Sequence, residues 1–185
     1  MTLRGIKADR TFLGWFSYLL QPPQITAVFP FIEPCKVATA YQGTTIYEEM
    51  FGGYLMTNPF VWFSVLSVFA RKHFEDKKCL VASVMCTVFA FIIVFADTQM
   101  AGILTRYVSD FGLFMYFGAA IAFACLYKAQ KSEDGKKFLT ALLVLGFAFT
   151  LFYNMLLVFT HTGESVKSYN PDFFYKIKYL TAFWL

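Results

Sequence analysis

The stretch Arg106-Tyr107-Val108-Ser109-Asp110-Phe111 places a cation, an acid and two aromatic rings close together. Arg106 and Asp110 are four residues apart, so on one α-helix they share a face and can form an ion pair. The planar guanidinium can instead hold a phosphate or sugar phosphate through two parallel hydrogen bonds at a membrane surface. Two interpretations of Arg106, Tyr107 and Asp110 therefore stay open: a lipid-phosphate or substrate contact, or a helix-entry ion pair with Tyr107 in an interfacial aromatic belt.

Other polar side chains give weaker signals. We interpret Glu33, Glu48 and Glu49 as solvated loop charges, because adjacent residues on a helix do not face each other. His73 and His161 lack a second metal ligand nearby, and His161 suits a helix C-terminus. We therefore predict no metal site and no cofactor, and the sequence identifies no catalytic residue.

The cysteines are Cys35, Cys79, Cys86 and Cys125, with no CxxC pair and no zinc spacing. They are expected to be small buried hydrophobic side chains. Serine-nucleophile, phosphate-loop and dinucleotide motifs are absent from the sequence as well.

Small side chains recur along the stretch 118–124. Gly118 and Ala122 are four residues apart, a spacing that lets another helix approach closely, whether from this chain or from another protein. Asn154 lies deep in a later apolar run, and its amide is expected to face protein, since an unpaired amide in lipid is costly.

The composition indicates an integral membrane protein. Apolar residues make up 58% of the 185-residue chain and charged residues only 15%, whereas soluble domains carry about 25% charge. A soluble chain of this length would leave large apolar patches exposed. The net charge of +4 comes from short loops between apolar runs, so nucleic acid is not an expected partner, whereas the lipid bilayer is.

Five runs lack charged residues: 11–32, 51–70, 79–96, 111–127 and 138–160. A spanning helix needs about 20 mostly apolar residues, and the last four runs qualify. The first run is interrupted by Pro22-Pro23, so it is either an interfacial or re-entrant segment or a kinked spanning helix. The sequence therefore predicts an all-α polytopic membrane protein with about four transmembrane helices and an N-terminal interfacial or re-entrant segment.

The loop charges predict an orientation. Segments 71–78 and 128–137 each hold four Lys or Arg residues, whereas 97–110 holds only Arg106, and cytoplasmic loops carry the Lys/Arg excess. We therefore expect 71–78 and 128–137 in the cytoplasm, and 97–110 and the C-terminus outside. The predicted divisions are an outward-facing segment 1–53, a four-helix membrane domain 54–160 and an outward-facing tail 161–185.

The stretch Arg106-Tyr107 followed by Asp110-Phe111, with Gln21-Pro22-Pro23 and Phe29-Pro30-Phe31 upstream, resembles the C-terminal membrane region of large bacterial proteins similar to the GT-C class of glycosyltransferases. The resemblance implies a bacterial envelope protein that handles a polyprenyl-phosphate-linked sugar at the outer face. Members of the class place their catalytic acid in an early outer loop, which has no counterpart here, and the apolar runs hold no charged residue of the kind a transporter needs. The resemblance thus implies a portion that is not catalytic alone; the alternative is a non-catalytic module that assembles with other helices or subunits.

Overall fold

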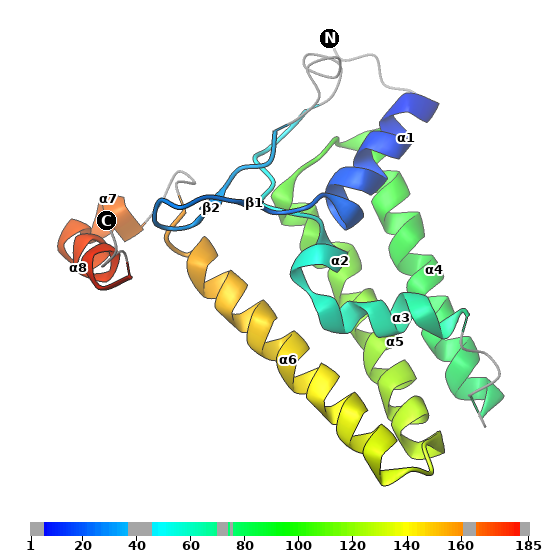
Figure 1. Cartoon of the computed structure of the whole chain (residues 1–185). Coiled ribbons are helices and arrows are strands. Elements are labelled where there is room, and N and C mark those ends of the chain that lie inside the picture. The colour runs from blue at the N-terminus through cyan, green and yellow to red at the C-terminus, as the bar shows by residue number, and fades with distance from the viewer. Residues whose placement is uncertain (1–5, 37–45, 70–73, 75, 161–165, 182–185) are drawn as a thin grey trace.

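The chain is mostly helical in the computed structural model, which describes residues 6–36, 46–69, 74, 76–160 and 166–181 (Figure 1). Three long helices dominate it: α4 (Lys77–Met100), α5 (Val108–Ala129) and α6 (Glu133–Leu157). Each is long and apolar enough to cross a membrane, α5 being taken together with the 3-10 turn η5 (Thr105–Tyr107) that precedes it. The prediction of a mainly helical chain with long apolar helices is confirmed.

The connections between these helices divide the molecule into two ends. α4 begins at the end where α5 stops and α6 starts, so the described parts of 71–78 and 128–137 lie together there (Figure 1). We call this the lysine end. The α4–α5 connection and the last turn of α6 lie at the opposite end, which we call the Arg106 end. The segments that the sequence assigns to one side of a membrane thus share one end of the bundle.

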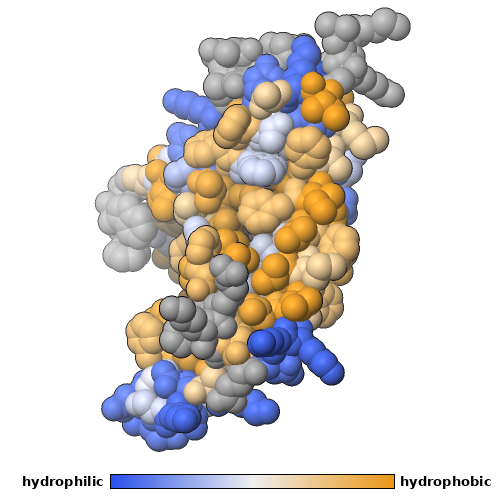
Figure 2. Space-filling view, turned by 90° about the vertical axis from the view of Figure 1, so that its right-hand side faces the viewer, coloured by the Kyte–Doolittle hydropathy of each residue, from blue (hydrophilic) through white to orange (hydrophobic). Residues whose placement is uncertain are grey.

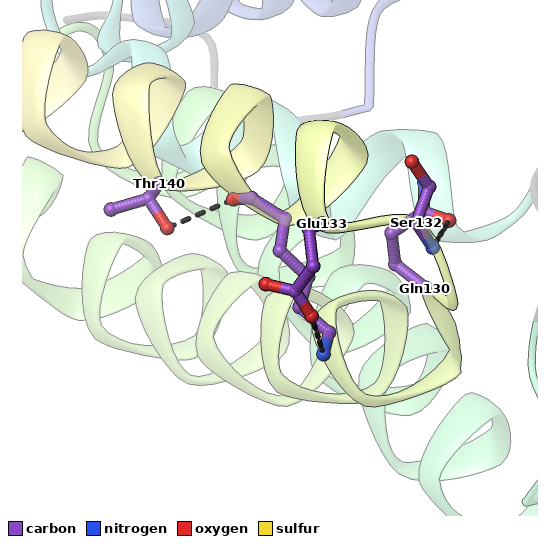
Figure 3. A network of polar contacts seen from close by, with 5 residues as sticks. Gln130, Ser132, Glu133 and Thr140 are labelled. Carbon is purple, nitrogen blue, oxygen red and sulfur yellow. Dashed lines mark hydrogen bonds and ion pairs between the residues drawn. The ribbon is translucent and has the colours of Figure 1, made fainter.

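At the lysine end, a short turn joins α5 to α6 (Figure 3). The Ser132 backbone N–H donates to Gln130 Oε1 at 3.3 Å, and Lys136 Nζ pairs with Glu133 Oε1 at 2.9 Å. Acidic side chains in the first turn of α6 favour the positive end of its dipole. α6 begins directly after its N-cap residue, Ser132.

The buried face of α4 is more polar than its exposed face. Ser83, Thr87 and Thr98 are at most 3% exposed and alternate with Ala90 and Val94 along one stripe. The large side chains point outward instead, each about half exposed: Val81, Met85, Val88, Phe89 and Ile92. Hydroxyls inside and hydrocarbon outside is the arrangement suited to lipid, because helix contacts in a bilayer use small and polar residues.

The run 51–70, expected as a fourth spanning helix, is divided. It forms α2 (Tyr54–Thr57), the 3-10 turn η3 (Pro59–Val61) and α3 (Trp62–Ser67), none of them long enough to span. Pro59 starts η3, as a first-turn proline should, but it lacks an N–H and so ends α2. The structure therefore does not confirm four spanning helices.

The broken segment still descends along the bundle. Tyr54 packs against Gly112 in the first turns of α5, and Ser67 accepts a hydrogen bond from Ser83 Oγ at 3.0 Å, two turns into α4. The next helix begins at Lys77 at the lysine end. The chain therefore passes from one end of the bundle to the other between Tyr54 and Lys77.

The N-terminal segment stays at the Arg106 end. It comprises α1 (Ala8–Trp15), the π-helix η1 (Phe16–Leu20) and an antiparallel hairpin of β1 (Gln24–Ile25) and β2 (Ile32–Glu33), with a cis Phe29–Pro30 bond in its turn. Lys7 bonds Gln99, and Tyr18 bonds the α4–α5 connection. Both ends of the helical stretch thus lie at one end of the bundle, which favours the re-entrant or interfacial interpretation over a kinked span.

The surface is consistent with this arrangement. Figure 2 shows the face turned toward α4, with a broad hydrophobic band in the middle and hydrophilic residues gathered above and below it. Two short helices close the chain, α7 (Val166–Tyr169) and α8 (Pro171–Thr181), near the hairpin (Figure 1).

Candidate functional site

The sequence candidates Arg106, Tyr107 and Asp110 lie where η5 leads into α5. The helix-entry ion pair between Arg106 and Asp110, one of the two interpretations that the sequence leaves open, is not formed among the described residues. Arg106 belongs to η5 and the α-helix begins only at Val108, so the two side chains do not share an α-helical face. The exposed Arg106 guanidinium lies over the ring of Tyr107, 5.4 Å from its centroid, and Asp110 Oδ1 accepts from Ser109 Oγ at 3.3 Å. Arg106 therefore remains available to an outside anion.

Glu48 fixes the turn that carries Arg106. Its Oε2 accepts hydrogen bonds from the backbone N–H of Thr105 at 2.9 Å and from the Thr105 hydroxyl at 3.0 Å. The neighbouring backbone adds two bonds, since Glu48 N–H donates to Ile103 O and Ile103 N–H donates to Ile46 O. Glu48 was interpreted from the sequence as a solvated loop charge; it is half-buried in the structure, and its carboxylate also fastens the connection.

Tyr18 holds the same connection from the other side. Its fully buried hydroxyl accepts from Leu104 N–H at 2.8 Å and donates to Gly102 O at 3.0 Å. Burial raises the pKa of the Tyr18 phenol well above its ordinary value, so it stays protonated and able to donate. Gly102 has φ +106 and abuts Ile46 O, a position that a side chain would not tolerate. Arg106 thus lies exposed on a connection that Glu48 and Tyr18 hold in place through hydrogen bonds.

Two carboxylates lie at the helix ends beside this connection. Asp97, in the last turn of α4, interacts electrostatically with Asp110, in the first turn of α5. Asp97 Oδ2 is a buried atom without a hydrogen-bond partner in the described part of the chain. In residues 6–36, 46–69, 74, 76–160 and 166–181, no group of three or more metal-ligating side chains comes together, and His73 and His161 lie outside these ranges.

The small-residue stripe packs within the chain. A side chain at Gly118 would meet Ser64 on α3 and Cys86 and Ser83 on α4, and Ala119 and Ala122 are fully buried. The close approach that the spacing of Gly118 and Ala122 predicts is therefore made by helices of this chain.

A cluster of buried hydroxyls links α3, α4 and α5 at this contact. Ser64 Oγ and Thr87 Oγ1 lie 2.6 Å apart, and Ser83 Oγ lies 2.8 Å from Gly118 O and 3.0 Å from Ser67 Oγ. All four hydroxyl side chains are at most 3% exposed. Because each has a partner, the polar core is satisfied without water.

The interruption of the helix in 51–70 is stabilised by specific hydrogen bonds. Side-chain donors reach two carbonyls of α2: Trp62 Nε1 donates to Leu55 O at 2.9 Å, and Asn58 Nδ2 donates at 3.2 Å to Tyr54 O, which also accepts the Asn58 backbone N–H. Tyr116 on α5 donates to Asn58 Oδ1 at 2.9 Å. Irregular backbone at membrane depth is tolerated where protein groups satisfy it, so the break is compatible with lipid.

The Asn154 amide, which is expected to face protein, does not face the rest of the described chain. Its side chain is exposed on α6, and Nδ2 donates to Thr150 O at 2.7 Å, one turn earlier in the same helix. This bond to the helix backbone satisfies part of the amide without a partner helix. Its neighbour Tyr153 points inward instead and donates to Phe51 O.

An apolar groove lies between the hairpin and α6. It has a volume of about 440 Å³. Hydrocarbon side chains line most of it, among them Ile25, Phe31, Phe149, Phe152 and Leu156. Because residues 149–156 form the last turns of α6, the groove belongs to the Arg106 end of the molecule.

Comparison with known proteins adds no relative. No family model matches the sequence, no curated protein matches it, and no solved structure matches its fold.

Proposed function

We propose that the chain is the membrane portion of a bacterial envelope protein that handles a polyprenyl-phosphate-linked sugar, with Arg106 as the contact for the lipid phosphate. One observation carries the proposal: an exposed arginine that pairs with no acid in the described part of the chain lies on a connection held in place by Glu48 and Tyr18. A guanidinium whose fork is not used by a carboxylate offers paired donors to a phosphate.

The membrane location is part of the proposal. It is supported by three helices long and apolar enough to cross a membrane, by the hydroxyl side chains on the buried face of α4 and by the hydrophobic band in Figure 2. We propose four crossings, three by continuous helices and one by the broken segment that starts at Tyr54. The lysine end then faces the cytoplasm, and Arg106 faces outside.

The apolar groove at the same end supports a ligand with a long hydrocarbon tail. The side chains that line the groove provide aromatic and branched aliphatic contacts for an isoprenoid chain. Binding sites for such groups are mainly apolar and have few polar anchors. Tyr107, over which Arg106 lies, belongs to the interfacial residue types that sit at head-group level.

Catalysis by this chain alone is not part of the proposal. Glu48 is engaged with Thr105, and Asp97 and Asp110 repel each other, so none of these acids is arranged as a ready acid–base pair with Arg106. A catalytic acid would come from further helices. A second candidate function, assembly with other subunits, is favoured by the exposed Asn154 amide on the outer face of α6.

The test is retention of undecaprenyl phosphate by the purified chain in native mass spectrometry. Wild type should retain it, Arg106→Gln should lose most of it, and Arg106→Lys should fall between, because a point charge replaces the fork. Lys131→Gln, an exposed cation at the lysine end, is the matched control and should behave as wild type. Equal retention by wild type and Arg106→Gln would refute the phosphate contact, and retention of undecaprenol equal to that of its phosphate would do the same.

A further inference from the structure

The C-terminal helix α8 is a well-formed helix with its own start signal. Asn170 Oδ1 accepts from Phe173 N–H at 3.1 Å, and Pro171 occupies the first helical position. An asparagine cap followed by proline is a strong helix start. The residues that follow, Pro171–Thr181, combine aromatic side chains with Lys176 and Lys178.

One side chain anchors α8 to the rest of the chain. Phe174 is 5% exposed and packs against Phe29 in the hairpin turn at 5.3 Å and Phe159 beyond α6 at 6.4 Å, between ring centroids. Figure 1 shows α8 nearly along its axis while α6 is seen from the side, so the axes of the two helices point in different directions. If α6 spans a membrane, α8 runs along the membrane surface at the Arg106 end.

The remaining faces of α8 differ in chemistry. Phe173, Ile177 and Leu180 recur at helical spacing and form one apolar stripe; Phe173 is 46% exposed and Leu180 66% exposed. Tyr175 and Tyr179, one turn apart, occupy a second stripe, and Tyr179 is 78% exposed. The exposed Lys176 lies between the two stripes. A helix with one buried, one apolar and one tyrosine-bearing face suits a boundary between lipid and water.

We propose that α8 lies in the head-group layer of the bilayer, with Phe173 and Leu180 toward the hydrocarbon and Tyr179 toward water. The apolar surface of α6 continues toward it through Met155 and Val158, each 58% exposed, so lipid that covers α6 also reaches α8. Lys176 complements the phosphate groups of anionic lipids. This inference rests on the proposed membrane location of α4, α5 and α6.

The test uses the whole chain in lipid nanodiscs, with single nitroxide spin labels on a background in which the native cysteines are replaced by alanine. Labels at Leu180→Cys and Tyr179→Cys should differ: the first should be relaxed mainly by oxygen, the second mainly by a water-soluble nickel complex. Val88→Cys on the outer face of α4 and Ser132→Cys at the lysine end are the lipid and water references.

The outcomes separate this inference from the membrane location. Water exposure at Val88→Cys would overturn both. Lipid exposure at Val88→Cys with water exposure at Leu180→Cys would overturn the inference alone, and so would shielding of Leu180→Cys from both reagents, the sign of a protein partner. For the head-group contact, adding phosphatidylglycerol to phosphatidylcholine nanodiscs should raise the oxygen-to-nickel ratio at Leu180→Cys, and Lys176→Gln should abolish that rise. A ratio unaffected by phosphatidylglycerol would refute the contact with anionic lipid.

Discussion

Replacing Tyr18 with phenylalanine keeps the ring but removes the hydroxyl, whose hydrogen bonds hold the α4–α5 connection in place; we call these bonds the clamp. The ring contact with Phe111, 5.5 Å between centroids, survives, so packing changes little. The lost hydroxyl leaves Leu104 N–H and Gly102 O without their buried partner. Each unsatisfied buried group costs about 1–3 kcal/mol, so we expect the loss of both bonds to lower the free energy of unfolding by about 2–6 kcal/mol.

The assay is reversible unfolding in mixed micelles, followed by circular dichroism. Tyr127→Phe is the matched control, because Tyr127 is 39% exposed at the lysine end and its ring contact with Phe123 does not use the hydroxyl. Undecaprenyl phosphate retention should fall in Tyr18→Phe as well, since the clamp positions Arg106. A loss of stability below about 0.5 kcal/mol, the size of an ordinary surface change, would refute the clamp.

The stability difference between wild type and Tyr18→Phe should also depend on pH. Burial raises the pKa of Tyr18 in the folded chain, so the stabilising effect of its protonated state is complete below the ordinary tyrosine pKa of about 10. Above that pH the unfolded chain loses the phenolic proton first, and the effect declines as pH rises toward the folded-state pKa. The stability difference between wild type and Tyr18→Phe should therefore narrow above about pH 10. A difference that widens there would contradict the sign.

Three further predictions concern other parts of the chain. Gly118→Val should destabilise the chain by about 1–3 kcal/mol through overpacking, because the new side chain meets Ser64 and Cys86, whereas Ala124→Val on the exposed face should be nearly neutral in the same unfolding assay. Cys35 is 6% exposed and burial raises its thiol pKa, so in detergent-solubilised protein maleimide should label it more slowly than an exposed thiol introduced by Ser109→Cys; equal rates would contradict its burial. Asn154→Leu should leave the unfolding free energy of the isolated chain within about 0.5 kcal/mol of wild type; a larger loss would mean that the amide faces protein after all.

The long apolar helices could be predicted from the sequence, because the length and hydropathy of an uncharged run are enough to identify them. The close approach at Gly118 follows from a local rule of this kind, the four-residue spacing of small side chains. The break in 51–70 did not follow. The run 51–70 was interpreted as one spanning helix, whereas the partners that stabilise its interruption, Trp62 and Tyr116, are recognisable only after folding.

The candidate site shows the same limit. Spacing alone put Arg106 and Asp110 on one helical face, but one turn of 3-10 helix removes that relation. Glu48 and Tyr18 gave no local signal, since each acts on a connection more than fifty residues further along the chain. A buried tyrosine or a glutamate that fastens a distant turn is a tertiary feature, and single-sequence patterns do not contain it.

The most direct test of the central claim is the sidedness of the two ends. On a background with the native cysteines replaced by alanine, Ser109→Cys beside Arg106 and Ser132→Cys at the lysine end are both exposed. In intact cells, with any outer barrier opened, a membrane-impermeant maleimide should label Ser109→Cys and should reach Ser132→Cys only after the membrane is permeabilised. Labelling of Ser132→Cys alone before permeabilisation, or of both positions equally, would contradict a membrane-spanning chain that presents Arg106 outside.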